Sequence, residues 1–246
     1  MRLIPAVLAA SLLGLAFQAP AAAAEKPLAG RIIVLDPGHQ LGNWNPKFAK
    51  EMSATKFNGS IVKGCNTTGT ATNAGLPEAT FAWRVAKRLR TLLEAQGATV
   101  SMTRTANSRE QWGPCVWDRA GFANEAKADA MISIHADGAP ASGRGFHVIA
   151  PSAIKGWTTD VAKPGRRLAR AMITGMTRGG AQPATYLSST LSIRSDQSTL
   201  NFSNVPTVIV ETGNMRNKAD AARMSSSAGQ QQYAEWLAGG IEAYFS

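Results

Sequence analysis

Two histidines and two glutamates in this chain stand at positions that suit catalytic groups. His39 follows the apolar run RIIVL by four residues, His135 stands near the end of the segment MISIHA, and Glu211 ends the segment TVIVE. Glu78 begins a helical pattern directly after a proline. Two imidazoles and one carboxylate are a known zinc ligand set that leaves a fourth position for water. These residue types favour a metal site made by His39, Glu78 and His135, with Glu211 as general base.

Each of these residues taken alone also has a structural explanation. His39 follows Pro-Gly and can simply close a turn, and His135 can be a buried histidine whose hydrogen bonds are satisfied. Glu78 in the first turn of a helix is favoured by the helix dipole in any case. The compact zinc motif HExxH is absent, and His147 lies inside a strand pattern that favours a structural or surface role. The metal hypothesis therefore depends on whether the fold brings the residues together.

The elements that must position these residues follow from hydrophobic periodicity. Short runs rich in β-branched residues predict strands at 31–35, 99–104, 130–136, 145–150 and 207–212. Helical spacing predicts helices at about 78–93, 118–127, 168–176 and 233–244. This alternation predicts a single α/β domain with a mostly parallel twisted β-sheet flanked by helices. Ligands bind such sheets beyond the carboxyl ends of the strands, so we expect the site at that edge.

The environment of the two glutamates is also predicted by pattern. Glu78 precedes Phe81, Val85 and Leu89 by three, seven and eleven residues, which places it toward the apolar face of its helix. Three apolar residues precede Glu211, so desolvation should raise the pKa of Glu211 toward the range that a general base needs.

The first 24 residues have the composition of a signal peptide. A positive start at Met1-Arg2 precedes an apolar run, and Ala22-x-Ala24 is a small-residue cleavage signature. A membrane anchor is the alternative, but the apolar run is shorter than the ~20 residues that a span needs. We therefore expect a signal peptide at 1–24 and one domain at 25–246, in a protein that is secreted.

Secretion affects how the two cysteines and the net charge are interpreted. An oxidising environment predicts a disulfide between Cys65 and Cys115. The chain has 26 Lys plus Arg and 16 Asp plus Glu, a formal net charge of +10. This charge indicates either attraction to anionic wall polymers and lipid headgroups or solubility alone, rather than a nucleic-acid partner. A serine hydrolase is disfavoured because no Gly-x-Ser-x-Gly segment is present.

Five segments carry a resemblance to a known family. They are IIVLDPGHQLG, the Pro77-Glu78 helix start, TVSMTRT, DRAGFANEAKADAMISIHADG and VPTVIVETGNMRN. In this order and spacing the chain resembles the zinc-dependent N-acetylmuramoyl-L-alanine amidases of the amidase-3 type, and more narrowly the small secreted wall amidases of mycobacteria and actinobacteria. The resemblance implies a peptidoglycan hydrolase that cuts the amide between N-acetylmuramic acid and the L-alanine of the stem peptide. It implies one Zn²⁺ per chain at the three ligands named above, and Glu211 as the catalytic residue. It also implies that 25–246 is the catalytic amidase domain and acts in the periplasm or cell wall.

The chain departs from the family pattern in two places. Gln40-Leu41 stands where a second glycine usually follows the histidine, and the interval between His39 and Glu78 is long. We expect this interval to form either a loop at the cleft, held by a Cys65–Cys115 disulfide, or a disordered surface insertion.

The expected partners follow from the resemblance and the composition. We expect a peptidoglycan or muropeptide substrate, no nucleic acid, no stable membrane insertion and a monomer. A protein activator of unknown identity stays open. A zinc peptidase acting within the stem peptide and a non-catalytic cell-wall-binding protein stay open as alternatives. Asp36 can orient a ligand imidazole or form an ordinary turn. The partner of the developing oxyanion is not identified, and the candidates for supporting the site are Arg104, Arg119, Asn124 and Asn214.

Overall fold

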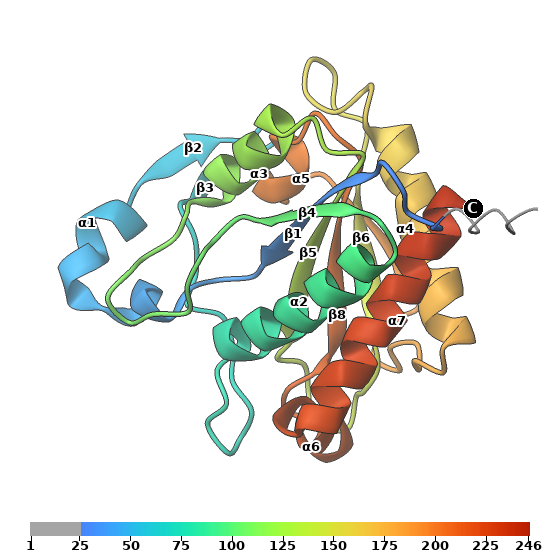
Figure 1. Cartoon of the computed structure of the whole chain (residues 1–246). Coiled ribbons are helices and arrows are strands. Elements are labelled where there is room, and N and C mark those ends of the chain that lie inside the picture. Colours follow the sequence, from blue (N-terminus) through green and yellow to red (C-terminus); the bar gives the residue numbers. More distant parts are fainter. Residues whose placement is uncertain (1–25) are drawn as a thin grey trace, which may run out of the picture.

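The computed structural model describes residues 26–246, so the expected signal peptide lies outside the described residues. A six-stranded sheet with the order β4-β1-β5-β8-β6-β7 forms the centre of the fold (Figure 1). All neighbouring strands run parallel except β6 and β8. The predicted α/β class with a mostly parallel sheet is confirmed. The strands are β1 (Ile32–Pro37), β4 (Thr99–Met102), β5 (Ala130–Asp137), β6 (His147–Pro151), β7 (Leu191–Arg194) and β8 (Thr207–Asn214).

Helices cover both faces of this sheet. One face is packed by α2 (Glu78–Ala95), α4 (Ala162–Arg178) and α7 (Ser227–Phe245), and α6 (Lys218–Ser225) packs against α7. The other face carries α3 (Val116–Glu125) and the short α5 (Ser198–Asn201). The closing helix begins earlier than its apolar pattern predicts, because Ser226 caps it and its first turns are polar. Within the described residues, no helix has both the length and the apolar character to cross a membrane.

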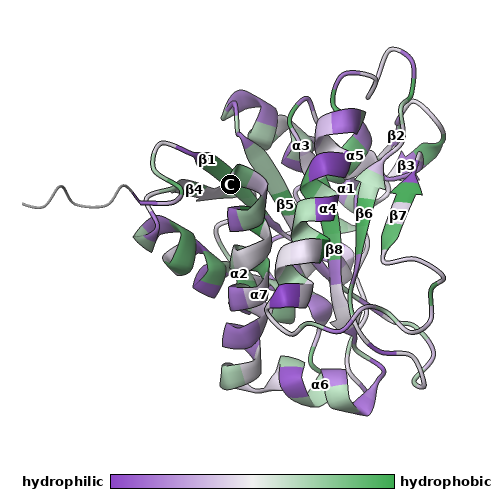
Figure 2. Cartoon of the chain, turned by 90° about the vertical axis from the view of Figure 1, so that its right-hand side faces the viewer, coloured by the Kyte–Doolittle hydropathy of each residue, from purple (hydrophilic) through white to green (hydrophobic). Residues whose placement is uncertain are grey.

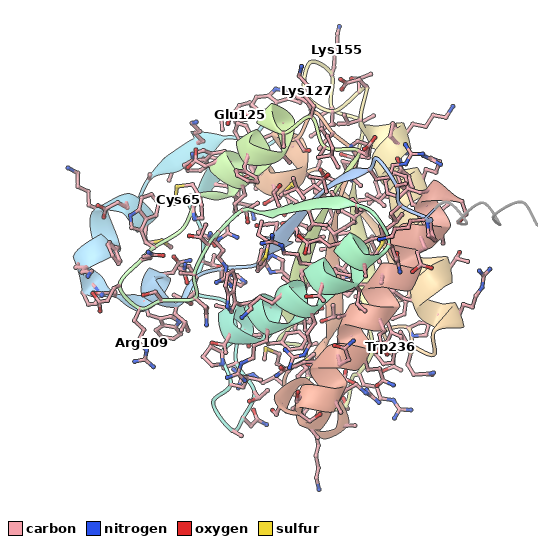
Figure 3. The ribbon with its side chains drawn as sticks, viewed as in Figure 1. Cys65, Arg109, Glu125, Lys127, Lys155 and Trp236 are labelled. Carbon is pink, nitrogen blue, oxygen red and sulfur yellow. A yellow bond between two sulfur atoms is a disulfide. The ribbon has the colours of Figure 1, made fainter. Side chains whose placement is uncertain are left out.

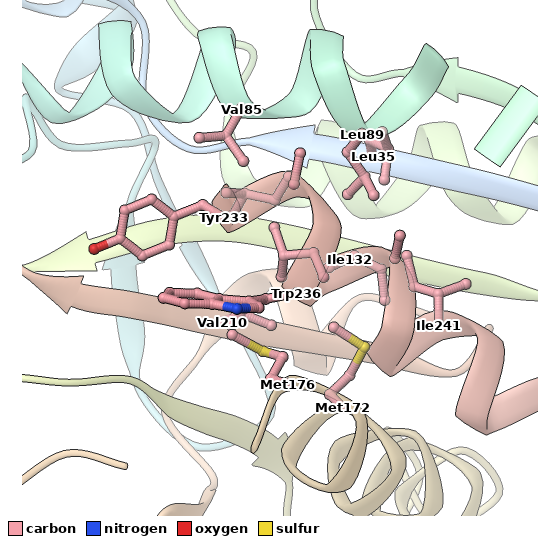
Figure 4. Close-up of a cluster of buried hydrophobic side chains, with 14 of the residues drawn as sticks. Leu35, Val85, Leu89, Ile132, Met172, Met176, Val210, Tyr233, Trp236 and Ile241 are labelled. Carbon is pink, nitrogen blue, oxygen red and sulfur yellow. The ribbon is translucent and has the colours of Figure 1, made fainter. Parts of the chain in front are cut away.

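Side-chain alternation along the strands divides the interior into two sides. Figure 4 shows the larger side, where Leu89 of α2 lies beside Leu35 of β1 and Val85 lies one turn away on the same helix. The neighbouring residue Val34 points the other way and joins a smaller core that includes Ala123 of α3. Figure 2 shows the apolar strands between helices whose outer faces are largely hydrophilic. Side chains on the same face of the sheet as Val34 therefore point toward α3 and α5.

The long segment between β1 and α2 builds one wall at the carboxyl edge of the sheet. It contains α1 (Ala49–Met52) and an antiparallel hairpin of β2 (Thr55–Phe57) and β3 (Val62–Gly64). Cys65 directly follows β3 and forms the predicted disulfide with Cys115, at the start of α3 (Figure 3). The first of the two expectations for this segment, a loop at the cleft held by the disulfide, is the one that the structure shows. The strands were missed because three residues are too few for a periodic signal.

Removal of this disulfide is expected to lower the stability of the protein. The two cysteines are 50 residues apart, which corresponds to about 4 kcal/mol on the chain-entropy model. Replacing both Cys65 and Cys115 by serine should lower the thermal midpoint by about 8–16 °C. Turnover should fall as well, because β3 borders the cleft. Calorimetry and a cleavage assay would test this, and a double variant with unchanged melting and unchanged turnover would contradict it.

Candidate active site

The four predicted site residues line one cavity of about 360 Å³ at the carboxyl edge of the sheet. His135 of β5 and Glu211 of β8 are register partners in the parallel ladder, so their side chains are neighbours on one face. Glu78 is the first residue of α2, and His39 lies just beyond β1. The topology therefore brings together residues that are far apart in the sequence.

Atoms of the three predicted ligands converge. Glu78 Oε1 lies 3.1 Å from His39 Nε2 and 2.8 Å from His135 Nδ1. The three ligand atoms lie within 4.8 Å of one another. The second nitrogen of His39, Nδ1, lies 3.0 Å from the carbonyl oxygen of Thr67, a contact that directs Nε2 toward the shared position. Because two imidazole nitrogens and a carboxylate oxygen are donors that zinc accepts, this group can hold a metal ion.

The backbone around the ligands explains the sequence Asp-Pro-Gly-His. His39 has a φ of 57°, in the left-handed region that residues with a β-carbon rarely adopt. At Gly38, a β-carbon would lie 2.4 Å from the ring of His135. Gly69, with a φ of 75°, approaches from the opposite wall, and a β-carbon there would lie 2.7 Å from His39 and 2.8 Å from Glu78. Both glycines are therefore required by close approach to the ligands.

The surroundings of the site shift the pKa values of its two glutamates in opposite directions. Burial by itself raises the pKa of Glu78, but the two imidazoles outweigh burial and hold the pKa well below its ordinary value. Burial lowers the pKa of His39, and the charge of Glu78 outweighs it and raises that pKa. The pKa of Glu211 is raised well above its ordinary value, by burial first and then by the charges of Glu78 and Asp137. Glu211 is therefore suited to accept and release a proton.

A buried ion pair supports the His39 loop. Arg119 Nη1 lies 2.7 Å from Asp36 Oδ1, and both side chains are almost fully buried. The same guanidinium donates to the carbonyl oxygens of Pro37 at 2.8 Å and of His39 at 2.7 Å. Asp36 therefore acts on the ligand loop indirectly, because it holds Arg119 and Arg119 holds the backbone of His39. Of the two alternatives for Asp36, direct orientation of a ligand imidazole is not what the structure shows, because its carboxylate accepts from Thr103, Arg119 and Ser133.

The remaining candidates for supporting the site donate hydrogen bonds to main-chain carbonyl groups, and they do not line the cavity. Arg104 donates to the carbonyl oxygen of Ala79 at 2.7 Å, which fixes the first turn of α2. Burial, together with the nearby charge of Arg119, lowers the pKa of Arg104 to about 9. Asn124 and Asn214 also donate to main-chain carbonyls. Arg104 therefore supports the site through the first turn of α2, whereas Asn124 holds the segment at Phe202 that precedes β8, and Asn214 holds the loop at Pro140 and Gly143 that follows β5.

A second polar group beside the cavity was missed from the sequence. His147 begins β6, whereas the pattern predicts it inside the strand, and its Nε2 lies 2.8 Å from Asp137 Oδ2. Tyr186 donates to the same oxygen at 2.9 Å. His147 is also the antiparallel register partner of Glu211. Asp137 lines the cavity and stands two residues after a predicted ligand, which is the one signal that could have pointed to this group.

An α/β sheet that holds a His-Glu-His donor set beside a desolvated glutamate is typical of metal-dependent hydrolases. The family model described as N-acetylmuramoyl-L-alanine amidase matches residues 33–243. The chain thus belongs to the N-acetylmuramoyl-L-alanine amidase family, a family of enzymes, as the sequence resemblance predicts.

Individual relatives agree with this assignment. The chain is 38% identical over 231 residues to an N-acetylmuramoyl-L-alanine amidase of Mycobacterium tuberculosis, covering 92% of this chain and 91% of the relative. The crystal structure of an N-acetylmuramyl-L-alanine amidase from Mycobacterium smegmatis superposes with a TM-score of 0.81 at 37% identity, covering 89% of this chain and 98% of that one. The apo form of the enzyme from Mycobacterium abscessus gives 0.82 at 40% identity, with 89% and 100% covered. The predicted similarity to mycobacterial amidases is therefore confirmed.

Proposed function

We propose that this protein is a secreted, zinc-dependent peptidoglycan amidase. It cleaves the amide between the lactyl group of N-acetylmuramic acid and the L-alanine of the stem peptide. His39, Glu78 and His135 hold one Zn²⁺, and Glu211 is the catalytic residue. The observation that carries the proposal is that these four side chains line one cavity in a member of the amidase family.

The metal ligands and Glu211 have different roles in the proposed amide hydrolysis. A bound zinc ion supplies a Lewis acid that polarises the scissile carbonyl and lowers the pKa of the attacking water. Glu211 accepts a proton from that water as the water oxygen attacks the carbonyl carbon. Glu211 then delivers the proton to the alanine nitrogen, because an amide nitrogen leaves only when it is protonated. The C–N bond breaks, which leaves a carboxylate on the lactyl group and a free amine on the peptide.

Secretion is supported by two independent features. The disulfide between Cys65 and Cys115 suits an oxidising compartment. Residues 1–24 have the charge and apolar pattern of a cleaved leader. We propose that the mature protein acts in the periplasm or cell wall as a monomer, with 25–246 as the catalytic domain.

A digest of purified muropeptides, analysed by mass spectrometry, tests this function. We expect release of the intact stem peptide with a free L-alanine amine. A chelator should lower the rate by more than about 100-fold, and added Zn²⁺ should restore it, because the metal supplies several kcal/mol of transition-state stabilisation. A cut inside the peptide would identify a zinc peptidase instead. A folded protein that binds no zinc and cuts nothing would identify a wall-binding protein.

A further inference from the structure

A single lysine enters a cavity whose other charged walls are carboxylates. Apart from the imidazoles, the charged side chains that line it are Glu78, Asp137, Glu211 and Lys63. Lys63 is the middle residue of β3, and its side chain is 39% exposed. We infer that Lys63 determines substrate specificity by binding a carboxylate of the stem peptide close to the cleaved bond. This inference rests on the amidase function proposed above and names the acidic form of its substrate.

The ammonium of Lys63 has an ion-pair partner but keeps its hydrogen-bond donors for a ligand. Its Nζ lies 3.7 Å from Asp196 Oδ2, close enough for an ion pair and beyond hydrogen-bond distance. The two oxygens of Asp196 already accept from Arg194, at 2.8 and 2.6 Å. Because Arg194 makes the shorter, two-point contact with Asp196, the half-exposed ion pair of Lys63 with Asp196 is the weaker of the two, and a substrate carboxylate can replace it.

The hairpin is attached by contacts that do not involve Lys63. The side-chain amide of Asn58 donates to the carbonyl oxygen of Asp196 at 3.2 Å and to Ser198 Oγ at 3.1 Å. Asn201 donates to the carbonyl oxygen of Asn58 at 2.9 Å, and the disulfide follows β3 directly. Lys63 thus stands on a strand that is fixed at both ends, so its charge is held at one wall of the cavity.

Charge complementarity gives this lysine a role in substrate binding. A stem peptide carries its first carboxylate on the D-glutamyl unit that follows L-alanine. The proposed Zn²⁺ offsets the charges of Glu78 and Glu211, so Asp137 is the carboxylate of the cavity wall that would repel this group. A cation on the hairpin wall offsets that repulsion. Because the cavity is only about 360 Å³, it accommodates groups close to the cleaved amide, so we assign the α-carboxylate of this second residue as the partner of Lys63.

The same hairpin provides a matched control. Lys56 is the register partner of Lys63 across the β2–β3 ladder and carries the same charge. Its Nζ lies 5.2 Å from the ring centre of Trp117 and 5.8 Å from that of Phe202. Lys56 does not line the cavity. A change at Lys56 therefore removes one positive charge from the hairpin without altering the cavity wall.

The test compares two muropeptides that differ only at the second residue, which ends in an α-carboxylate or an α-carboxamide. Lys63→Gln should raise KM for the carboxylate substrate by about tenfold, as expected for one lost charge-assisted contact, with kcat changed less than about twofold. KM for the carboxamide substrate should change less than about twofold. Lys56→Gln should leave both KM values unchanged. In a Glu211→Gln background, calorimetry should show the same selective loss of affinity without turnover.

Two results would overturn the inference alone. One is an equal effect of Lys63→Gln on both substrates, and the other is no effect on either while the unmodified enzyme cleaves both. If the unmodified enzyme releases no free L-alanine amine from either muropeptide, the proposed function fails, and the assignment of Lys63 fails with it.

Discussion

Replacing Glu211 by glutamine should lower kcat by about 10²- to 10⁴-fold, the usual contribution of a general acid-base group. Glutamine has nearly the same shape but cannot take a proton from water or return it to the alanine nitrogen. Glu211 is not one of the three convergent ligands, so the zinc content should stay at that of the unmodified protein. Steady-state kinetics on a muropeptide and metal analysis of the same preparation measure both quantities.

The control for this variant is Glu235→Gln, on the exposed side of α7. It removes the same charge far from the cavity and should leave kcat unchanged. If Glu211→Gln keeps more than about a tenth of the original kcat with its metal bound, another group must accept the proton. If instead the metal is lost, Glu211 contributes to the metal site, and the assignment of three ligands is wrong.

The position of the candidate site was predictable because it depends on strand ends and on one helix start. His135 and Glu211 each end an apolar run, and parallel strands place such ends at one edge. The position of Glu78 was predictable because it lies at helical spacing from the apolar residues of α2. In the structure it is buried on that face of the helix. These features are set by local periodicity, which a single sequence contains.

Other parts of the site depend on contacts between distant segments, so periodicity could not predict them. Gly69 must be glycine because His39 and Glu78 lie against it, yet its own segment has no regular pattern. The contact of Tyr186 with Asp137 joins a loop to the end of β5 across 49 residues. Lys63 faces the cavity only because the hairpin folds back over α5. In each case the controlling interaction is tertiary, so the sequence gives no local signal.

Replacing Arg119 by methionine should lower the free energy of unfolding by roughly 3–5 kcal/mol, because the change leaves Asp36 buried without its partner. Arg119 Nη1 lies 2.7 Å from Asp36, in surroundings that exclude water. The variant also loses the donor to the carbonyl oxygen of His39, so zinc affinity should fall by about 10- to 100-fold, as when an outer support of a ligand is removed. Denaturant unfolding and competition with a chelating dye measure the two effects.

The double variant Asp36→Asn/Arg119→Met separates the ion pair from the support of His39. It should recover much of the lost stability, because no unpaired charge stays buried, but zinc affinity should stay low.

In the unmodified protein, burial raises the pKa of Asp36, but Arg119 and the hydroxyls of Ser133 and Thr103 outweigh it and leave the pKa below its usual value. This stabilisation is therefore complete above about pH 4, the unfolded value, and is lost as pH falls through the lower folded value. The stability difference between the unmodified protein and Arg119→Met should shrink in that acidic range. A difference that is independent of pH would show that Asp36 is not the charge that Arg119 neutralises.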